Sequence, residues 1–312
     1  MIYNEQKLES FSRRAFKYEE QKIIDTHQAI RDAISEHFDG KAIKEKYGLG
    51  QVPALDVYLQ GSYKNSTNVT KSSDVDLVVQ LKTIWRDNKE ILPADQLTKY
   101  DASYVNVSYP FEEFNINIFK ALQAYFREAN VINDNKCLKI REHGKYCSAD
   151  VIPCFTYRYY GFFESVEKQN FQEGMYFITN EGKFVRNFPK QHYEALNAKS
   201  KATNGSFKET VRMFKNIRDD LTDRRVLYPD VAKSYFIENL LYVLPDSCFI
   251  GTRLKVFEQI MSLLAQLSDL NMIRNFKCAN GVDQLFGENN WQYHDAKFFI
   301  DTLIRIQHES QF

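Results

Sequence analysis

The chain has 312 residues, a length that suffices for one large domain or two modest domains with a hydrophobic core. Its 44% apolar and 14% aromatic residues exclude a disordered chain. The net charge is zero, from 41 basic and 41 acidic residues, which argues against strong nucleic-acid binding because proteins that grip long nucleic acids usually carry a basic excess.

The first half of the chain mixes helical and strand-like patterns. Residues 5–38 are predicted to form one long helix that packs across both halves of the chain, because apolar residues recur there at helical spacing and Gly40 follows. Residues 174–187 are predicted to form a hairpin, since strand-like runs flank a turn at 180–182. Between these segments the pattern predicts strands at 56–60, 74–81, 136–142 and 146–160, a polar loop at 61–73 and a helix at 111–129.

From Pro189 onward the pattern is helical, and Pro189 itself suits the first turn of a helix. Helices are predicted at 189–202, 206–221, 232–244 and 252–267. The sequence therefore predicts an α+β chain with a mixed domain at residues 1–188 and a helical domain at residues 189–312.

Three aspartates are candidates for a metal site. Asp74 and Asp76 lie two residues apart in a predicted strand, so alternation places both carboxylates on one face. Such carboxylates repel each other unless a cation lies between them, and hard oxygen ligands suit Mg²⁺. If the predicted strand that carries Asp150 is a neighbour, three carboxylates converge, as two-metal nucleotidyl transfer requires. The alternative is that Asp74 and Asp76 are two solvated acids at a strand end.

The loop before these aspartates favours the metal site. Gly61 and Ser62 directly follow the first predicted strand, where glycine allows a close backbone approach to phosphate and serine can donate to a phosphate oxygen. A Gly-Ser pair alone is weak, since any loop can contain one. Followed by a polar loop and then D-x-D in a strand about a dozen residues later, it becomes a specific combination.

The run LQGSYKNSTNVTKSSDVDLVV resembles the signature of the DNA-polymerase-β-like nucleotidyltransferase superfamily, and ADVIPCF resembles its third-acid strand. Further along, RNFPKQHYEALNAKSKATNGSFKETVRMFKNIRDDL and KSYFIENLLYVLPD resemble the bacterial CD-NTases, relatives of animal cyclic GMP-AMP synthase and oligoadenylate synthase. The resemblance implies an α+β fold: a polymerase-β-like core with a mixed sheet, flanking helices and a long N-terminal helix, plus a C-terminal helical domain.

The resemblance also implies an activity. Such enzymes make cyclic or short linear oligonucleotide second messengers from NTPs without a template, using two Mg²⁺ (or Mn²⁺) ions and releasing pyrophosphate. We expect ATP as a substrate, with UTP or GTP as further candidates, a monomeric enzyme, and a product that acts on a separate effector protein in anti-phage defence. The chain lacks the His/Cys zinc insertion that helps the animal enzyme bind DNA, so activation by double-stranded DNA is not expected.

The motif positions carry implied roles for single residues. Gly61 and Ser62 would touch the triphosphate, and Asp74, Asp76 and Asp150 would bind metal. Lys215 would hold the donor phosphates, Ser234 would bind phosphate, Tyr235 would stack on a base, and Asn187 would read a base edge. The alternatives are a solvated helix face for Lys215, a core position for Tyr235, and a helix cap for Asn187.

Two other functions compete with a signalling synthase. The same chemistry could modify an RNA or tRNA end or a protein hydroxyl. A degenerate nucleotidyltransferase fold could serve only for binding, although the intact acids and Gly-Ser pair count against this.

The cysteines and the apolar pattern bear on location. Five cysteines without a C-x-x-C spacing favour neither a disulfide framework nor a zinc ribbon. No segment resembles a signal peptide or a membrane span. We therefore expect a cytoplasmic protein without a membrane partner.

Overall fold

The computed structural model describes residues 3–14, 20–69, 74–105, 107, 109–269, 272–287 and 290–309. By its internal contacts the chain forms two compact units. The first, called here the sheet unit, consists of Tyr18–Gly61 and Asp74–Pro189. The second, the helical unit, consists of Met1–Lys17, Ser62–Ser73 and Lys190–Phe312. The predicted domains divide the chain linearly, whereas these units interleave in sequence.

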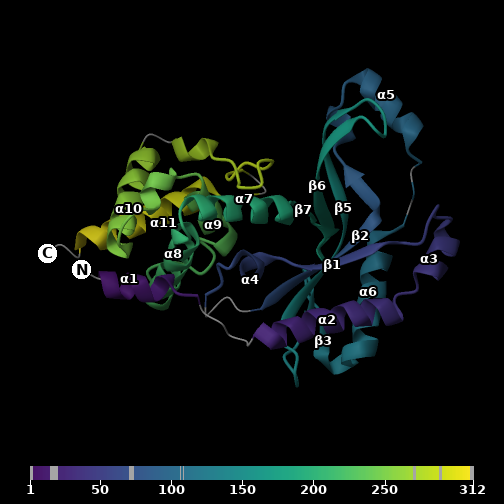
Figure 1. Cartoon of the computed structure of the whole chain (residues 1–312), viewed down its shortest axis with the longest axis horizontal. Coiled ribbons are helices and arrows are strands. Elements are labelled where there is room, and N and C mark those ends of the chain that lie inside the picture. Colours follow the sequence, from purple (N-terminus) through teal and green to yellow (C-terminus); the bar gives the residue numbers. More distant parts are fainter. Residues whose placement is uncertain are drawn as a thin grey trace. The chain divides into compact units, whose positions relative to one another are not determined.

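The sheet unit contains, among the described residues, a seven-stranded mixed sheet (Figure 1). Its main path has the order β1-β2-β5-β4-β3, while β6 pairs with β5 and β7 pairs with β6. The β2–β5 pair is parallel and the other pairs are antiparallel. The strands are β1 (Leu55–Leu59), β2 (Val75–Asp87), β3 (Val131–Asn133), β4 (Leu138–Ile140), β5 (Ala149–Phe163), β6 (Gln169–Ile178) and β7 (Phe184–Asn187).

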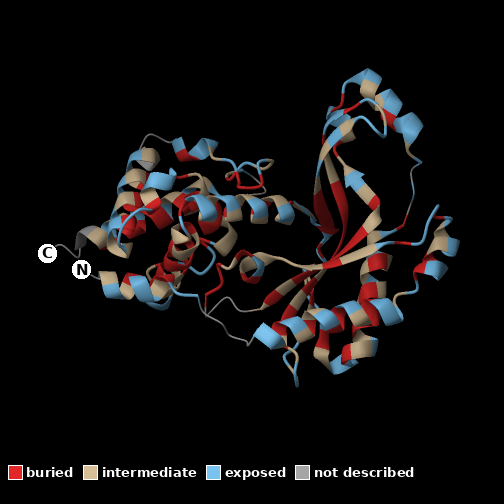
Figure 2. Ribbon diagram, viewed as in Figure 1, coloured by how far each residue is buried: buried red, intermediate tan, exposed pale blue. Residues whose placement is uncertain are grey.

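The centre of the sheet is apolar because β2 and β5 carry nearly continuous apolar runs. Helices α2 and α6 pack against each other and against β1 and β5. Along both helices, buried positions alternate with exposed ones, as expected for amphipathic helices that cover a sheet (Figure 2). The helices of this unit are α2 (Glu20–His37), α3 (Gly40–Tyr47), α5 (Ala94–Ser103) and α6 (Phe111–Phe126).

The last residues of β2 and β5 extend with β6 toward α5 and form an aromatic subcluster (Figure 1). Tyr100, Tyr160 and Phe163 are buried together there, and Trp85 Nε1 donates to Tyr100 Oη at 3.0 Å. The predicted strand at 74–81 therefore ended too early. The remaining residues of β2, at 82–87, are mostly polar, with only Ile84 and Trp85 apolar, and partners of Trp85 such as Tyr100 and Tyr104 come from a later segment of the chain.

The helical unit has one contiguous apolar core. Leu8, Phe214, Leu240 and Phe299 are each buried in it, although they come from four different helices. The helices of this unit are α1 (Glu5–Ser12), α7 (Pro189–Ala202), α8 (Ser206–Asp223), α9 (Ser234–Tyr242), α10 (Arg253–Asp269) and α11 (Tyr293–Glu309). A further short helix, α4 (Gly61–Asn65), begins at the last residue of the first segment of the sheet unit, and its other residues belong to the helical unit.

The prediction of one long helix at 5–38 was wrong. Helix α1 ends at Ser12, where Arg13 takes an extended conformation (φ −68°, ψ 146°), and α2 begins at Glu20. Residues 15–19 lie outside the described part of the chain. Leu8 is buried in the helical unit, whereas Ile30 is buried in the sheet unit. Helical periodicity reports an apolar face without saying which partner covers it, so two helices with different partners resembled one.

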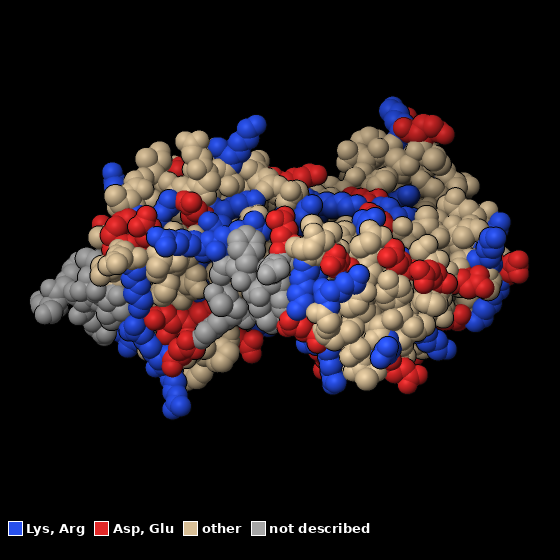
Figure 3. Space-filling model, turned by 60° about the horizontal axis from the view of Figure 1, so that its bottom comes forward, with Lys and Arg blue, Asp and Glu red and all other residues tan. Residues whose placement is uncertain are grey.

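The surface carries charges of both signs. On the face in Figure 3, Lys and Arg side chains are interspersed with Asp and Glu, in keeping with the zero net charge of the chain. That the protein binds nucleic acids weakly stays a prediction. Among the described residues, no helix has both the length and the hydropathy that a bilayer span needs.

Candidate active site

The pairing of β2 with β5 brings two of the predicted acids together. The strands are neighbours, as convergence of the carboxylates requires, and they run parallel, with Asp76 as the register partner of Asp150. Adjacent strands lie roughly 5 Å apart, so these carboxylates leave the same face of the sheet as close neighbours. Val75 and Leu77, which flank Asp76, are fully buried on the opposite face. Asp74 immediately precedes β2 and is half-buried, like Asp76 and Asp150.

The environment of Asp150 suits a cation. Its Oδ1 atom is buried and forms no hydrogen bond. Burial raises the pKa of Asp150 above its usual value. The charge of Lys139 and a hydrogen bond with Cys137 oppose the shift, while the negative charge of Asp74 adds to it. A buried carboxylate oxygen with a like charge nearby gains most from a divalent ion. The carboxylates of Asp76 and Asp150, with Asp74 just before them in the chain, are oxygen donors of the kind that suits Mg²⁺ or Mn²⁺.

Among the described residues, no group of three or more His, Cys, Asp or Glu side chains is arranged so that it could hold a metal ion by itself. Mg²⁺ rarely needs such a cage, because it is commonly held by one or two carboxylates together with substrate phosphates and water. The role of the three aspartates as metal ligands stays a prediction that this geometry supports.

Lys139 is a further neighbour of the acids, which no motif in the sequence marks. It lies on β4 as the register partner of Asp150, so Lys139, Asp150 and Asp76 form a row across three strands. Its Nζ atom lies 3.9 Å from Asp150 Oδ1 and 3.6 Å from Asp134 Oδ2. Asp150 is the main reason that the pKa of Lys139 is raised. Lys139 does not belong to the motif that contains the acids, so only the register of the strands identifies it as their neighbour.

Gly61 packs directly against the second acid. Its φ of +68° lies in the left-handed region that favours glycine. A Cβ atom at this position would lie 2.0 Å from Asp76 Oδ2, a separation that real atoms do not adopt. Next to it, half-buried Ser62 lies within α4, so the predicted polar loop at 61–73 was wrong for its first five residues. Contact of Gly61 and Ser62 with a triphosphate stays a prediction.

In the helical unit, Lys215 is fully buried, so the alternative of a solvated helix face is wrong. Its ammonium donates to Glu238 Oε1 at 2.7 Å and to the carbonyl oxygen of Thr67 at 3.1 Å. This buried ion pair was not predictable from the sequence, since nothing local to Lys215 indicates its partner on α9. That Lys215 holds donor phosphates stays a prediction.

Ser234 and Tyr235 open helix α9. Ser234 Oγ accepts a long hydrogen bond of 3.4 Å from Arg218. Tyr235 is half-buried against the apolar core, and its ring centroid lies 4.9 Å from that of His192. Both the core alternative and the stacking role for Tyr235 fit this placement, so its contact with a base stays a prediction.

Asn187 ends β7 in the sheet unit, opposite Met175 on β6. Gly174, next to Met175, allows β7 to lie this close to β6, because a Cβ at Gly174 would lie 2.6 Å from the carbonyl oxygen of Asn187. The Oδ1 atom of Asn187 accepts a hydrogen bond from the Phe188 amide at 2.8 Å. The base-reading role of Asn187 stays a prediction.

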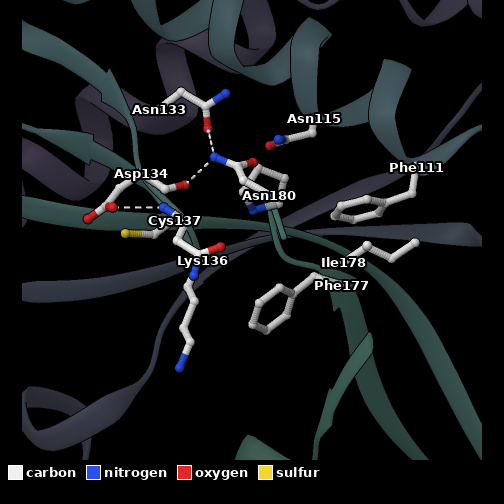
Figure 4. A pocket seen from close by; sticks show the side chains of 11 residues that line it. Phe111, Asn115, Asn133, Asp134, Lys136, Cys137, Phe177, Ile178 and Asn180 are labelled. Carbon is white, nitrogen blue, oxygen red and sulfur yellow. Dashed lines mark hydrogen bonds between the residues drawn. The ribbon is translucent and has the colours of Figure 1, made fainter. Parts of the chain in front are cut away.

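A small pocket elsewhere in the sheet unit does not coincide with these residues (Figure 4). Asn180 spans it, donating to Asn133 Oδ1 at 3.2 Å and to the carbonyl oxygen of Asp134 at 2.9 Å. Phe111 and Phe177 are among its apolar walls. None of the predicted site residues lines this pocket, so it does not mark the candidate active site.

Comparison with known proteins identifies the family. Residues 194–308 match the model of the cGAS/DncV-like nucleotidyltransferase C-terminal helical domain. The cyclic UMP-AMP synthase of Rhodothermus marinus is 38% identical over 88% of this chain and 88% of its own length. A cyclic dipurine nucleotide synthase of Elizabethkingia meningoseptica is 30% identical over 80% of each chain.

A solved structure agrees over nearly the whole fold. The Rhodothermus marinus CdnE c-UMP-AMP synthase with Apcpp and Upnpp superimposes with a TM-score of 0.82 and 35% identity, covering 98% of this chain and 97% of that one. This agreement confirms the predicted α+β, polymerase-β-like fold with a C-terminal helical domain. The chain therefore belongs to the bacterial CD-NTase family and is a nucleotidyltransferase.

Proposed function

We propose that this enzyme joins NTPs into a cyclic dinucleotide without a template and releases pyrophosphate. The observation that carries the proposal is the register pairing of Asp76 with Asp150 on parallel strands, with Gly61 packed against Asp76. This arrangement suits metal-assisted nucleotidyl transfer. The similarity to cyclic-nucleotide synthases supports a second NTP as the acceptor.

We assign the proposed chemistry to a small set of residues. Asp74, Asp76 and Asp150 would hold two Mg²⁺ (or Mn²⁺) ions, whose positive charge would favour ionisation of the attacking sugar hydroxyl and offset the charge of the departing pyrophosphate. Gly61 and Ser62 bind the triphosphate. In the helical unit, Lys215 and Ser234 bind phosphate, and Tyr235 stacks on a base.

ATP and UTP are the proposed substrates. The 38% identical relative is named a cyclic UMP-AMP synthase, whereas the 30% identical relative is named for purines. The amide of Asn187 can pair with the O4/N3–H edge of uracil or with the N6/N1 edge of adenine. The greater similarity to the uridine-using relative favours UTP over GTP.

The proposed function includes a cellular location and a role in the cell. We place the enzyme in the cytoplasm as a monomer whose product switches on a separate effector protein during anti-phage defence. No nucleic-acid or membrane partner is part of the proposal.

The direct test needs only the purified protein. It is incubated with all four NTPs and Mg²⁺ or Mn²⁺, treated with phosphatase, and the surviving products are identified by mass spectrometry. The expected product is a phosphatase-resistant cyclic dinucleotide that contains UMP and AMP. A product that forms only when RNA, tRNA or a protein acceptor is added would instead favour transfer to that acceptor.

Asp150→Asn is expected to reduce turnover more than nucleotide binding. Asp150 is proposed to serve mainly the ion that activates the attacking hydroxyl, whereas the triphosphate brings its own magnesium. Turnover is measured beside the affinity for Mg²⁺-bound ATP and UTP. An affinity that falls in proportion to the rate would show that the assigned role of Asp150 is wrong.

Asn187→Ser is expected to change base choice while most activity survives. The substitution removes the bidentate amide but keeps the backbone pairing with Met175. A bidentate contact is worth about 1–3 kcal/mol in base discrimination, so the ratio of UTP to purine incorporation should shift measurably in a competition assay. An unchanged product mixture with lower thermal stability would assign Asn187 to structure alone.

A further inference from the structure

Glu238 on α9 is a buried carboxylate with an unusually full set of partners. Its Oε1 accepts hydrogen bonds from Lys215 Nζ at 2.7 Å and from Thr67 Oγ1 at 2.5 Å. Its Oε2 lies 2.8 Å from His192 Nε2 and accepts a longer bond of 3.4 Å from Asn65 Nδ2. Only 4% of Glu238 is exposed, and all these partners belong to the helical unit.

The carboxylate is held in its charged form. Burial on its own raises the pKa of Glu238, but Lys215 and His192 outweigh burial and bring the pKa well below its usual value. A buried ion pair seldom adds net stability compared with well-packed apolar residues. Its place at the centre of a buried polar network, beside the apolar core, therefore points to a requirement for orientation rather than for stability alone.

The partners of Glu238 lie next to the proposed nucleotide-binding residues of this unit. Ser234 and Tyr235 lie about one turn before Glu238 on the same helix. Asn65 and Thr67 belong to the segment that begins with Ser62. Lys215 is itself one of the proposed phosphate-binding residues.

His192 extends this network to the stacking residue. Its Nδ1 atom is buried without a hydrogen bond, so the bond from Nε2 to Glu238 fixes the orientation of the ring. The same ring packs against Tyr235, with centroids 4.9 Å apart and planes inclined by 32°. Glu238 thus acts on Lys215 directly and on Tyr235 through His192.

We propose that Glu238 is a positioning residue for nucleotide binding, which orients the Lys215 ammonium and, through His192, the Tyr235 ring. This inference rests on the proposed function, because that function gives Lys215 and Tyr235 their roles. Without the carboxylate charge, the buried ammonium has no counter-ion among its partners, and the His192 ring loses the charged acceptor that sets its angle.

The test is Glu238→Gln, which keeps the shape of the side chain and removes its charge. Binding of a non-hydrolysable UTP analogue with Mg²⁺ is measured by calorimetry at a temperature at which the variant is fully folded. We expect affinity to fall about tenfold to a hundredfold, since small misplacements of positioning groups cost up to that much. The matched control is Leu303→Ala, which removes core contacts on α11 and should lower thermal stability without changing affinity.

A second variant tests the same role if the first does not fold. Glu238→Asp keeps the charge but withdraws the carboxylate by one methylene, so it should fold and bind the analogue with intermediate affinity. Wild-type affinity in Glu238→Gln or, if that variant does not fold, in Glu238→Asp, would overturn the positioning role. If the wild type binds the analogue but makes no cyclic product, the proposed function fails while the affinity comparison still decides the role of Glu238.

Discussion

Asp76→Asn is expected to lower turnover by roughly a thousandfold or more while the fold stays intact. The substitution keeps the shape of the side chain and removes one negative metal ligand. Asp76 is the register partner of Asp150 on the neighbouring strand, so the two ligands act together. The electrostatic support of such a site is worth several kcal/mol. Asp74→Asn should have an effect of the same kind, and near-wild-type turnover in the double variant would contradict the assignment of the active site.

Thermal stability separates this loss from unfolding. In the metal-free protein, removing one of several crowded carboxylates relieves repulsion, so the Tm of Asp76→Asn should equal or exceed that of the wild type. Asp87→Asn is the matched control, because it removes a carboxylate from the other end of the same strand. The Asp87 carboxylate contacts Tyr100 and the Lys89 amide, so this control should keep its turnover.

The core strands and most helices were predictable because their signals are local. The apolar run after Asp74 and the run around Asp150 each indicate a buried strand, and the structure places strands at both. The hairpin around residues 180–182 was predictable for the same reason, since a turn motif lies between two strand-like runs.

Other elements depend on partners that lie far away in sequence. The break after Ser12 follows from α1 and α2 joining different cores, which no local pattern records. Helix α4 is only five residues long and begins at a glycine with positive φ, so it resembled a loop. Helices α3, α5 and α11 and strand β3 were not predicted at all.

Some residues of the candidate site were likewise predictable from local patterns, and others were not. The aspartates and the Gly-Ser pair were identified because their spacing in the motif is specific. The pairing of Lys139 with Asp150 and of Lys215 with Glu238 arises from strand register and helix packing, so only the structure reveals these partners. Long-range charge pairs leave no periodic signal in a sequence.

Gly61→Ala is expected to lower both turnover and stability. The new Cβ would lie 2.0 Å from Asp76 Oδ2 and 2.9 Å from its Cγ, so the carboxylate or the backbone must move. The backbone at Gly61 also has a φ of +68°, which costs an alanine roughly 1–2 kcal/mol. Because a displacement of about 1 Å in a reacting group can cost on the order of a hundredfold, turnover should fall by about that factor.

Gly48→Ala separates backbone strain from the clash with Asp76. Gly48 ends α3 in the same unit with a φ of +61°, and a Cβ there would meet nothing within 4 Å. This control should lose stability from strain alone and keep wild-type turnover. If turnover falls equally in the two variants once the unfolded fraction is subtracted, the contact between Gly61 and the Asp76 carboxylate has no part in catalysis. A loss confined to Gly61→Ala would show that glycine is required there because the catalytic carboxylate occupies the space of a side chain.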